Sequence, residues 1–246
     1  MLNFIGAGIN FDFTEKGIRQ LEESERIYAE IYTSPIEEKL VLELEKKVGK
    51  KIELIEREKV ESNFLVEKAE KEKISLIVMG DPLIATTHIS LIIECKKKGI
   101  ETKIIHNSSI LSAAIGKSGL QAYRFGKSAT LPHWKKNFEP VSSIEIVEEN
   151  KKRNLHTILF LDVEGKEGIM NAKEGIERIE EIELKLGRKI IDELIVLSRV
   201  GYEDEKISFG YKKDLKKLNL GKPLFIFIIP AKLHIVEKEY LEFFRV

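Results

Sequence analysis

The chain has 246 residues, 43% of them apolar, with 41 Lys and Arg against 41 Asp and Glu. This apolar content is enough for a folded core and excludes disordered or low-complexity classes. Because the net charge is zero, we expect no nucleic-acid binding through a basic face.

Nothing in the sequence indicates export or membrane insertion. The opening residues Met1 to Gly6 lack a basic segment and reach glycine at once, unlike a signal peptide. Cys95 is the single cysteine, so no internal disulfide can form. The longest apolar run, Leu224–Pro230, is far shorter than the roughly 20 residues that a membrane helix needs. We therefore expect a cytoplasmic protein that contacts no membrane.

Short apolar runs alternate with amphipathic charged stretches through the first half of the chain. Strands are predicted at Leu2–Ile5, Tyr28–Tyr32, Ile52–Ile55, Ile74–Met79 and Thr102–His106. Helices are predicted after the cap residue Thr14 and at Ile36–Val48, Val60–Lys71 and Thr87–Lys98. Five strands separated by helices favour a mainly parallel sheet covered on both faces.

Small residues dominate 107–119, which we interpret as a domain junction with a short helix starting near Ser109. We therefore expect an α/β domain at 1–108 and a second α/β domain at 109–246. In the second, strands are predicted at Ala122–Phe125, Thr157–Leu161, Leu194–Leu197, Ile207–Tyr211 and Leu224–Ile229. Helices are predicted at Ser143–Lys152, Asn171–Leu186 and Val236–Phe244. The short turn at 201–204 predicts a hairpin, and hence a mixed sheet.

Two glycine-containing turns follow predicted strands. Gly6-Ala7-Gly8 suggests a dinucleotide fingerprint, but Phe11 stands where a third glycine is needed, which disfavours NAD or FAD. Gly80-Asp81-Pro82 follows the most apolar strand, and open α/β sheets bind ligands at the carboxyl ends of strands. Pro82 disfavours a helical conformation at Asp81, so we expect Asp81 to be exposed at this rim.

Other catalytic signatures are missing from the sequence. The five histidines, His88, His106, His133, His156 and His234, show no metal-ligand spacing, so no metal is expected. No Gly-x-Ser-x-Gly elbow occurs, and the Gly-Lys-Ser at 126–128 lacks the upstream glycine of a phosphate-binding loop. The residues alone thus predict a two-part α/β protein with a ligand cleft and leave the ligand open.

Taken together, the motifs resemble one family, the diphthine synthases, within the tetrapyrrole-methylase-like class of S-adenosylmethionine methyltransferases. The segments that carry the resemblance are Phe4–Gly8, Ala29–Ser34, Gly80–His88, Ile105–His106, Ser109–Ile110, Phe125–Thr130, Leu155–Asp162 and Lys232–Glu237. They span nearly the whole chain, and the Gly80–His88 and Phe125–Thr130 segments are the most specific.

The resemblance implies two α/β domains, a mainly parallel N-terminal sheet and a mixed C-terminal sheet, with the cofactor in the cleft between them, and a homodimer. It implies methyl transfer from S-adenosylmethionine, leaving S-adenosylhomocysteine, to the amino group of a modified histidine in translation elongation factor 2. That histidine carries a 3-amino-3-carboxypropyl arm, and repeated methylation would give the trimethylammonium group of diphthine in an archaeal-type enzyme.

Carried over by position, the resemblance implies eight cofactor contacts. They are Ile9, Asp81, Ile84, Ser109, Ile110, Leu161, Val200 and Phe225. The chemistry of the transfer requires no catalytic residue, and we assign none, because the leaving thioether is neutral and the amine can lose its proton to water before it binds. Neither His88 nor His106 is assigned a catalytic role, although both lie near the predicted rim. Lys127 and Arg124 are candidates for steering a protein substrate.

Three alternatives stay open. A methylase of the same fold could act on a tetrapyrrole or on ribosomal RNA. A nucleotide-binding oxidoreductase is disfavoured by Phe11. A non-catalytic protein that binds an adenosyl ligand would differ only in lacking turnover.

Overall fold

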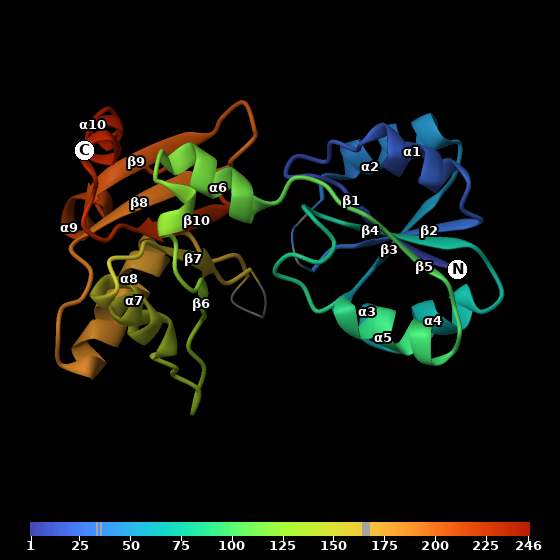
Figure 1. Cartoon of the computed structure of the whole chain (residues 1–246), viewed down its shortest axis with the longest axis horizontal. Helices are drawn as coiled ribbons and strands as arrows, with labels where there is room; N and C mark the ends of the chain where they lie inside the picture. The colour runs from blue at the N-terminus through green and yellow to red at the C-terminus, as the bar shows by residue number, and fades with distance from the viewer. Residues whose placement is uncertain (33, 35, 164–167) are drawn as a thin grey trace. The chain divides into compact units, whose positions relative to one another are not determined.

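The computed structural model describes residues 1–32, 34, 36–163 and 168–246, which form two compact units (Figure 1). The N-terminal unit spans Met1–Ile110 and the C-terminal unit spans Leu111–Val246. The division therefore falls two residues after the boundary that the small-residue segment suggested. Each unit is built on its own five-stranded sheet, so the predicted α/β class is confirmed.

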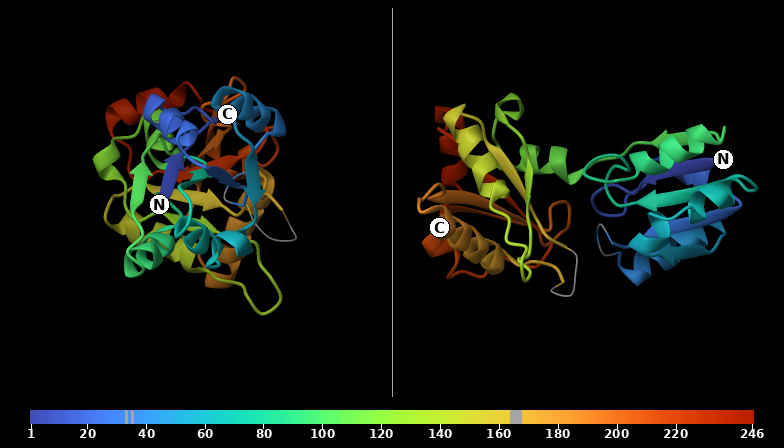
Figure 2. Two further views of the ribbon diagram at one scale, coloured as in Figure 1. Left: turned by 90° about the vertical axis from the view of Figure 1, so that its right-hand side faces the viewer. Right: turned by 90° about the horizontal axis from the view of Figure 1, so that it is seen from below.

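The N-terminal sheet is entirely parallel. Its strands are β1 (Leu2–Gly6), β2 (Arg26–Glu30), β3 (Ile52–Ile55), β4 (Ile74–Val78) and β5 (Thr102–Ile105). They lie in the order β3-β2-β4-β1-β5, visible side by side in Figure 2. The consequence for function is that β4 and β5 flank β1, so the carboxyl ends of these three strands are neighbours.

Helices cover both faces of this sheet (Figure 1). They are α1 (Glu15–Glu22), α2 (Glu38–Val48), α3 (Arg57–Val60), α4 (Phe64–Ala69) and α5 (Ile89–Lys97). Successive strand residues serve opposite faces: Phe4 packs in the cluster with α4 and α5, and Ile5 in the cluster with α1 and α2. This two-sided burial explains the near-continuous apolar runs of the strands.

One predicted helix of the N-terminal unit is wrong in its extent. Val60–Lys71 was expected to be a single helix, but the structure has α3 and α4 with a break between them. At the break, the Ser62 hydroxyl donates to the Lys59 carbonyl and accepts from the Phe64 amide. Serine side chains compete in this way for the hydrogen bonds of the helix backbone, so Ser62 ends one helix and starts the next.

The C-terminal sheet is mixed, as predicted. Its strands are β6 (Ala129–Leu131), β7 (Thr157–Leu161), β8 (Glu193–Ser198), β9 (Lys206–Tyr211) and β10 (Phe225–Ile229), in the order β6-β7-β10-β8-β9. β8 and β9 form the expected antiparallel hairpin, and β10 is antiparallel to both of its neighbours. The helices are α6 (Ile110–Ser118), α7 (Ser142–Lys152), α8 (Ala172–Leu186), α9 (Lys212–Leu215) and α10 (Ile235–Glu242).

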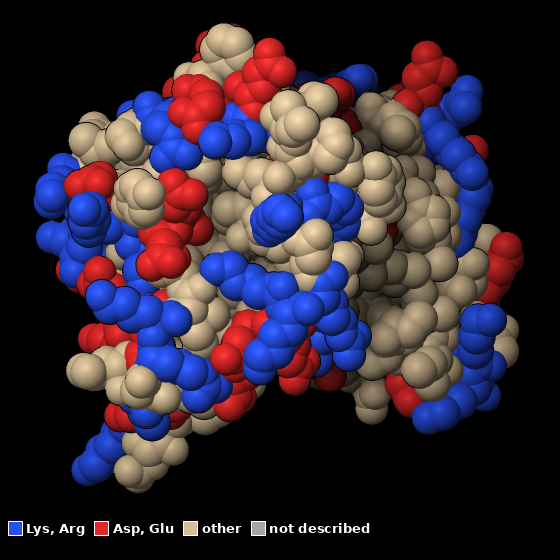
Figure 3. Space-filling model, turned by 60° about the vertical axis from the view of Figure 1, so that its left-hand side comes forward, with Lys and Arg blue, Asp and Glu red and all other residues tan. Residues whose placement is uncertain are grey.

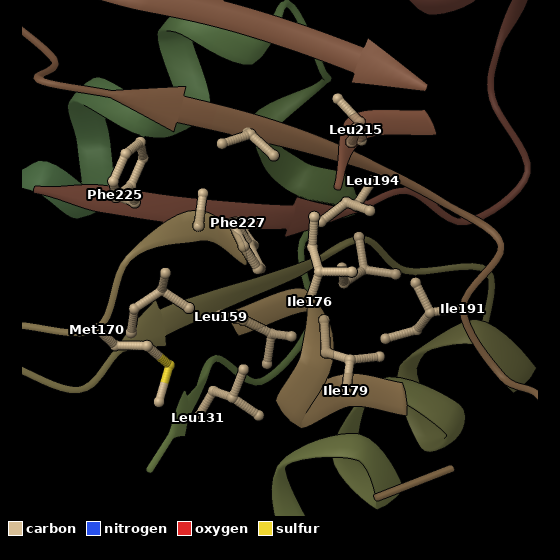
Figure 4. Packing of buried hydrophobic residues seen from close by; sticks show 14 of the residues in the cluster. Leu131, Leu159, Met170, Ile176, Ile179, Ile191, Leu194, Leu215, Phe225 and Phe227 are labelled. Atoms are coloured by element: carbon tan, nitrogen blue, oxygen red, sulfur yellow. The ribbon is translucent and has the colours of Figure 1, made fainter. Parts of the chain in front are cut away.

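The core of the C-terminal unit lies between its sheet and α7 and α8. Ile176 and Ile179 of α8 pack against Leu159, Leu194 and Phe227 of three adjacent strands (Figure 4). Helix α8 begins at a capping box formed by Asn171 and Glu174 and ends at Gly187 in the left-handed conformation. On the sheet's other face lie α6 and α10 (Figure 1).

The strand predicted at Ala122–Phe125 is wrong. Ala122–Arg124 forms a single 3-10 turn, and the strand in this region is β6, which starts at Ala129. The apolar residues that suggested a strand are held in a turn because the Gln121 amide and the Arg124 side chain both bind Glu237. Arg124 and Glu237 are 113 residues apart in the sequence, so local periodicity cannot predict this contact.

The surface shown in Figure 3 mixes basic and acidic side chains, in keeping with the zero net charge. Within the described part of the chain, no helix has the length and apolar character needed to cross a membrane.

Candidate functional site

The glycine turns after β1 and β4 meet at the carboxyl edge of the N-terminal sheet. The Gly8 amide donates to the Gly80 carbonyl at 3.1 Å, and the Gly80 amide donates to the Gly8 carbonyl at 2.8 Å. Both glycines have a positive φ, 66° and 72°, which other residues rarely adopt. The two segments identified by their sequence, 6–8 and 80–82, therefore form one structure, which we call the rim.

Gly6 is required at the centre of this rim because its neighbours approach too closely for a side chain. A Cβ atom there would lie 2.7 Å from the Gly80 carbonyl oxygen and 2.9 Å from Asn107 Cβ. Since β1 lies between β4 and β5, the missing side chain lets residues that follow those two strands meet across it.

Asp81 and His106 make this contact. One carboxylate oxygen of Asp81, Oδ2, lies 2.8 Å from His106 Nδ1 and accepts from the Asn107 amide at 3.3 Å. The other, Oδ1, accepts from the Leu83 amide at 3.0 Å. The Asp81 side chain is 7% exposed, whereas that of His106 is 68% exposed. The prediction of an exposed Asp81 is thus wrong: the carboxylate is buried because it satisfies two backbone amides and an imidazole.

Asn107 secures the segment that follows β5. Its side-chain amide donates to the carbonyls of Gly6 at 2.9 Å and Asp12 at 2.7 Å, and its Oδ1 accepts from the Ser108 amide. These bonds tie the segment after β5 to the end of β1 and to the loop that precedes α1. Position 106 is consequently held on a fixed backbone.

His88 holds the far end of the loop that begins at Gly80. Its Nδ1 donates to the Pro82 carbonyl at 3.0 Å, and Tyr32 Oη lies 3.3 Å from its Nε2. Burial lowers the pKa of His88, and burial also raises the pKa of Tyr32 to about 12. Both side chains are therefore neutral near pH 7, and the Tyr32 hydroxyl is the donor to His88. Because both ring nitrogens of His88 are hydrogen-bonded, this side chain fixes the conformation of the loop.

The other cofactor residues predicted in the N-terminal unit lie in the same loops. Ile9 follows the first glycine turn, and Ile84 exposes apolar surface in the loop after β4. Ser109 is buried, and Ile110 begins α6 beside it. With Asp81, all five belong to segments that leave the carboxyl edge of the sheet.

The three residues predicted in the C-terminal unit also share one sheet edge. Leu161 is the last residue of β7, and Phe225 is the first of the antiparallel neighbour β10. Phe225 pairs with Ser198 at the end of β8, and Val200 follows two residues later. All three side chains are largely buried. The structure thus assembles two separate groups from residues widely spaced in the sequence.

A second histidine–carboxylate pair lies inside the C-terminal unit. The Ala231 amide donates to His156 Nδ1 at 3.0 Å, and His156 Nε2 lies 3.3 Å from Glu237 Oε1. Glu237 also accepts from Arg124 Nη1 at 2.5 Å and from the His234 amide at 2.7 Å. Burial lowers the pKa of His156. Since Arg124 is engaged here, it is a poor candidate for steering a substrate.

The Phe125–Thr130 motif has a structural explanation in the same region. Asn150 accepts from the Lys127 amide and donates to the Lys127 carbonyl. A Cβ at Gly126 would lie only 2.2 Å from Asn150 Oδ1, so glycine is needed for this close approach. The segment therefore anchors the backbone that leads into β6.

Sequence reasoning missed the pairing of Asp81 with His106 and the central position of Asn107. The available signal was that the motif residues Asp81 and His106 each follow a strand closely. The strand order that makes them neighbours was not available. Among the residues that the structure describes, no group of three or more His, Cys, Asp or Glu is arranged to hold a metal.

Comparisons with known proteins agree with this architecture. Residues 1–215 match the family model described as tetrapyrrole (corrin/porphyrin) methylases. The diphthine synthase of Methanosarcina mazei is 37% identical, over 98% of this chain and 94% of its own length. That of Methanocaldococcus jannaschii is 38% identical, over 99% and 98%. A crystal structure of a diphthine synthase superposes with a TM-score of 0.88 at 32% identity, covering 99% of this chain and 95% of that one. The chain belongs to the diphthine synthases of the tetrapyrrole methylase family and is a methyltransferase.

Proposed function

We propose that this chain uses S-adenosylmethionine to methylate the amino group of the 3-amino-3-carboxypropyl-histidine of translation elongation factor 2. The observation that carries the proposal is the rim at the carboxyl edge of the parallel sheet, together with His106 and Asn107, which hydrogen-bond to it. Family membership supports the reaction, and the rim supports the location of the cofactor.

The residues at the rim suit a sulfonium nucleoside. Gly80 presents partly exposed backbone without a side chain, and the buried Gly6 lets the neighbouring segments pack closely around it. Ile84 offers exposed apolar surface for an aromatic base or an alkyl chain. Asp81 holds the loop in place through the Leu83 and Asn107 amides. When bound, the cofactor would supply a methyl group on a positively charged sulfur.

The contribution of the protein is then mainly positional. The transfer is an in-line displacement, so the amine and the methyl carbon must be aligned while water is kept away. Alignment of this kind supplies several kcal/mol, up to about 7–11 kcal/mol in ideal cases. The loop from Gly80 to His88 is anchored by Asp81 at its start and by His88 at its end, which gives the cofactor a fixed wall. The eight predicted cofactor contacts, and a homodimeric assembly, belong to this proposal.

Labelled S-adenosylmethionine and elongation factor 2 that carries the unmethylated arm test the proposal. We expect label on the factor, and none on a factor whose target histidine lacks the arm. Ribosomal RNA and a tetrapyrrole are included as competing acceptors. Label on either of them, or binding of the cofactor without any transfer, would contradict the proposed substrate.

A further inference from the structure

His106 is the exposed member of the pair at the rim, and only one of its ring nitrogens is engaged. Nδ1 lies 2.8 Å from Asp81 Oδ2. Within the described ranges, no residue is hydrogen-bonded to Nε2, and the side chain is 68% exposed. The ring therefore presents one nitrogen to solvent at the rim.

The contact with Asp81 determines which nitrogen carries the proton. A carboxylate accepts hydrogen bonds and cannot donate them, and Asp81 already accepts from the amides of Leu83 and Asn107. Nδ1 of His106 must therefore be the donor. In the neutral ring this leaves Nε2 as a free acceptor with its lone pair directed away from Asp81.

The ring is also held in orientation. Asp81 is fixed by three donors, and the backbone at position 107 is fixed by Asn107, whose side chain binds the Gly6 and Asp12 carbonyls. A proton acceptor contributes most when its geometry is set before the substrate arrives. A carboxylate behind an imidazole also stabilises the positive charge that the ring gains when it accepts a proton.

We propose that His106 Nε2 takes the proton from the substrate's ammonium group before methyl transfer, an inference that rests on the proposed function. The N–H bond breaks, its electron pair stays on the substrate nitrogen, and the proton binds Nε2. That pair then forms the bond to the methyl carbon while the carbon–sulfur pair goes to sulfur, which becomes neutral. The imidazolium returns its proton to water through its exposed edge.

This role answers a chemical need of the reaction. Aliphatic amines are mostly protonated near pH 7 and have no lone pair to attack with. Each methyl added to nitrogen requires the loss of one proton, so repeated methylation requires repeated removal. An exposed imidazole can reset in solvent between transfers. In the N-terminal unit the other histidine, His88, is bound on both nitrogens and cannot serve.

The main test compares His106→Ala with Asn107→Ala in methyl transfer to elongation factor 2 carrying the arm. Removal of a general base lowers rates by roughly 10²–10⁴-fold, so we expect at least a 100-fold lower kcat for His106→Ala. Added imidazole should raise the kcat of His106→Ala at least tenfold. Asn107→Ala loosens the same segment and keeps the ring, so imidazole should not improve it.

A second readout needs no turnover. In nitrogen NMR spectra of the intact protein, with the His106 signals assigned from their loss in His106→Ala, the neutral ring should carry its proton on Nδ1. Replacing Asp81 by alanine should shift the population toward the Nε2 protonated form. Calorimetry should show that His106→Ala still binds the cofactor, so that its lower rate reports the transfer step.

The outcomes separate this inference from the proposed function. If the wild type methylates the factor and His106→Ala does so equally well, or if imidazole fails to restore it, His106 is not the proton acceptor. A neutral ring that carries its proton on Nε2 in the wild type would likewise overturn the inference. If the wild type methylates nothing, the proposed function itself fails.

Discussion

The two histidine–carboxylate pairs of this molecule have the same chemistry and opposite surroundings. His106 is bound to Asp81 through Nδ1 and exposes Nε2 at the rim. His156 is fully buried, with Nδ1 bound by the Ala231 amide and Nε2 by Glu237. The first pair leaves Nε2 exposed, as the proposed proton transfer requires. The second has no open position and ties three distant segments of the C-terminal unit together.

This comparison assigns stability to the closed pair and ligand chemistry to the open one. Variants that remove one pair and leave the other intact test this assignment. Trp134, the single tryptophan, packs against the core of the C-terminal unit, so its fluorescence reports the unfolding of that unit.

The largest effect on stability is expected for Glu237→Ala. Loss of this carboxylate removes the acceptor of Arg124 Nη1 and of the Gln121 and His234 amides. Breaking a buried ion pair from one side costs about 3–5 kcal/mol. Urea unfolding followed by Trp134 fluorescence measures the loss, and Glu239→Ala on the exposed side of α10 is the control. A loss below about 1 kcal/mol would show that the closed pair is not structural.

Asp81→Ala should act mainly on binding. Without the carboxylate, the Leu83 and Asn107 amides lose their acceptor and the loop after β4 loses its anchor. We expect the Kd for S-adenosylmethionine to rise at least tenfold, which corresponds to about 1.4 kcal/mol. Calorimetry measures it. The control is Asp12→Ala, since Asp12 contacts Asn107 through its carbonyl and not its carboxylate. Unchanged affinity would remove Asp81 from the proposed site.

The smallest effect concerns the pH dependence of stability. Burial lowers the pKa of His156 in the folded state below the value of about 6.5 expected when unfolded. Below about pH 6.5 the unfolded chain therefore binds more protons than the folded chain. The free energy of unfolding falls as the pH drops from about 6.5 to the lower pKa of the folded state. One histidine contributes at most about 1.4 kcal/mol per pH unit.

His156→Asn tests this dependence because the asparagine oxygen can still accept from the Ala231 amide. Between pH 6.5 and 5, the unfolding free energy of this variant should decline less steeply than that of the wild type. Identical slopes would mean that His156 is not held neutral by its surroundings.

Local sequence patterns were sufficient for most of the fold. Short apolar runs located β3 and β7 at their observed limits. The patterns failed where a side chain competes with the backbone, as at Ser62, or where a distant partner decides, as Glu237 does for the turn at Ala122–Arg124.

The candidate site was predictable in its segments and not in its contacts. Asp81 was identified because it follows a buried parallel strand, and its buried state was missed because its partners come from β5. Periodicity places residues on strands but gives no strand order. Only the order β4-β1-β5, with Gly6 between the flanking strands, brings Asp81 and His106 together.

A crystal structure with S-adenosylhomocysteine would test the central claim most directly. We predict that the nucleoside lies against the rim, in contact with the loop of Asp81 and Ile84 and with the start of α6 at Ser109 and Ile110. A ligand bound elsewhere, or a rim that stays empty at saturating concentrations, would contradict the account.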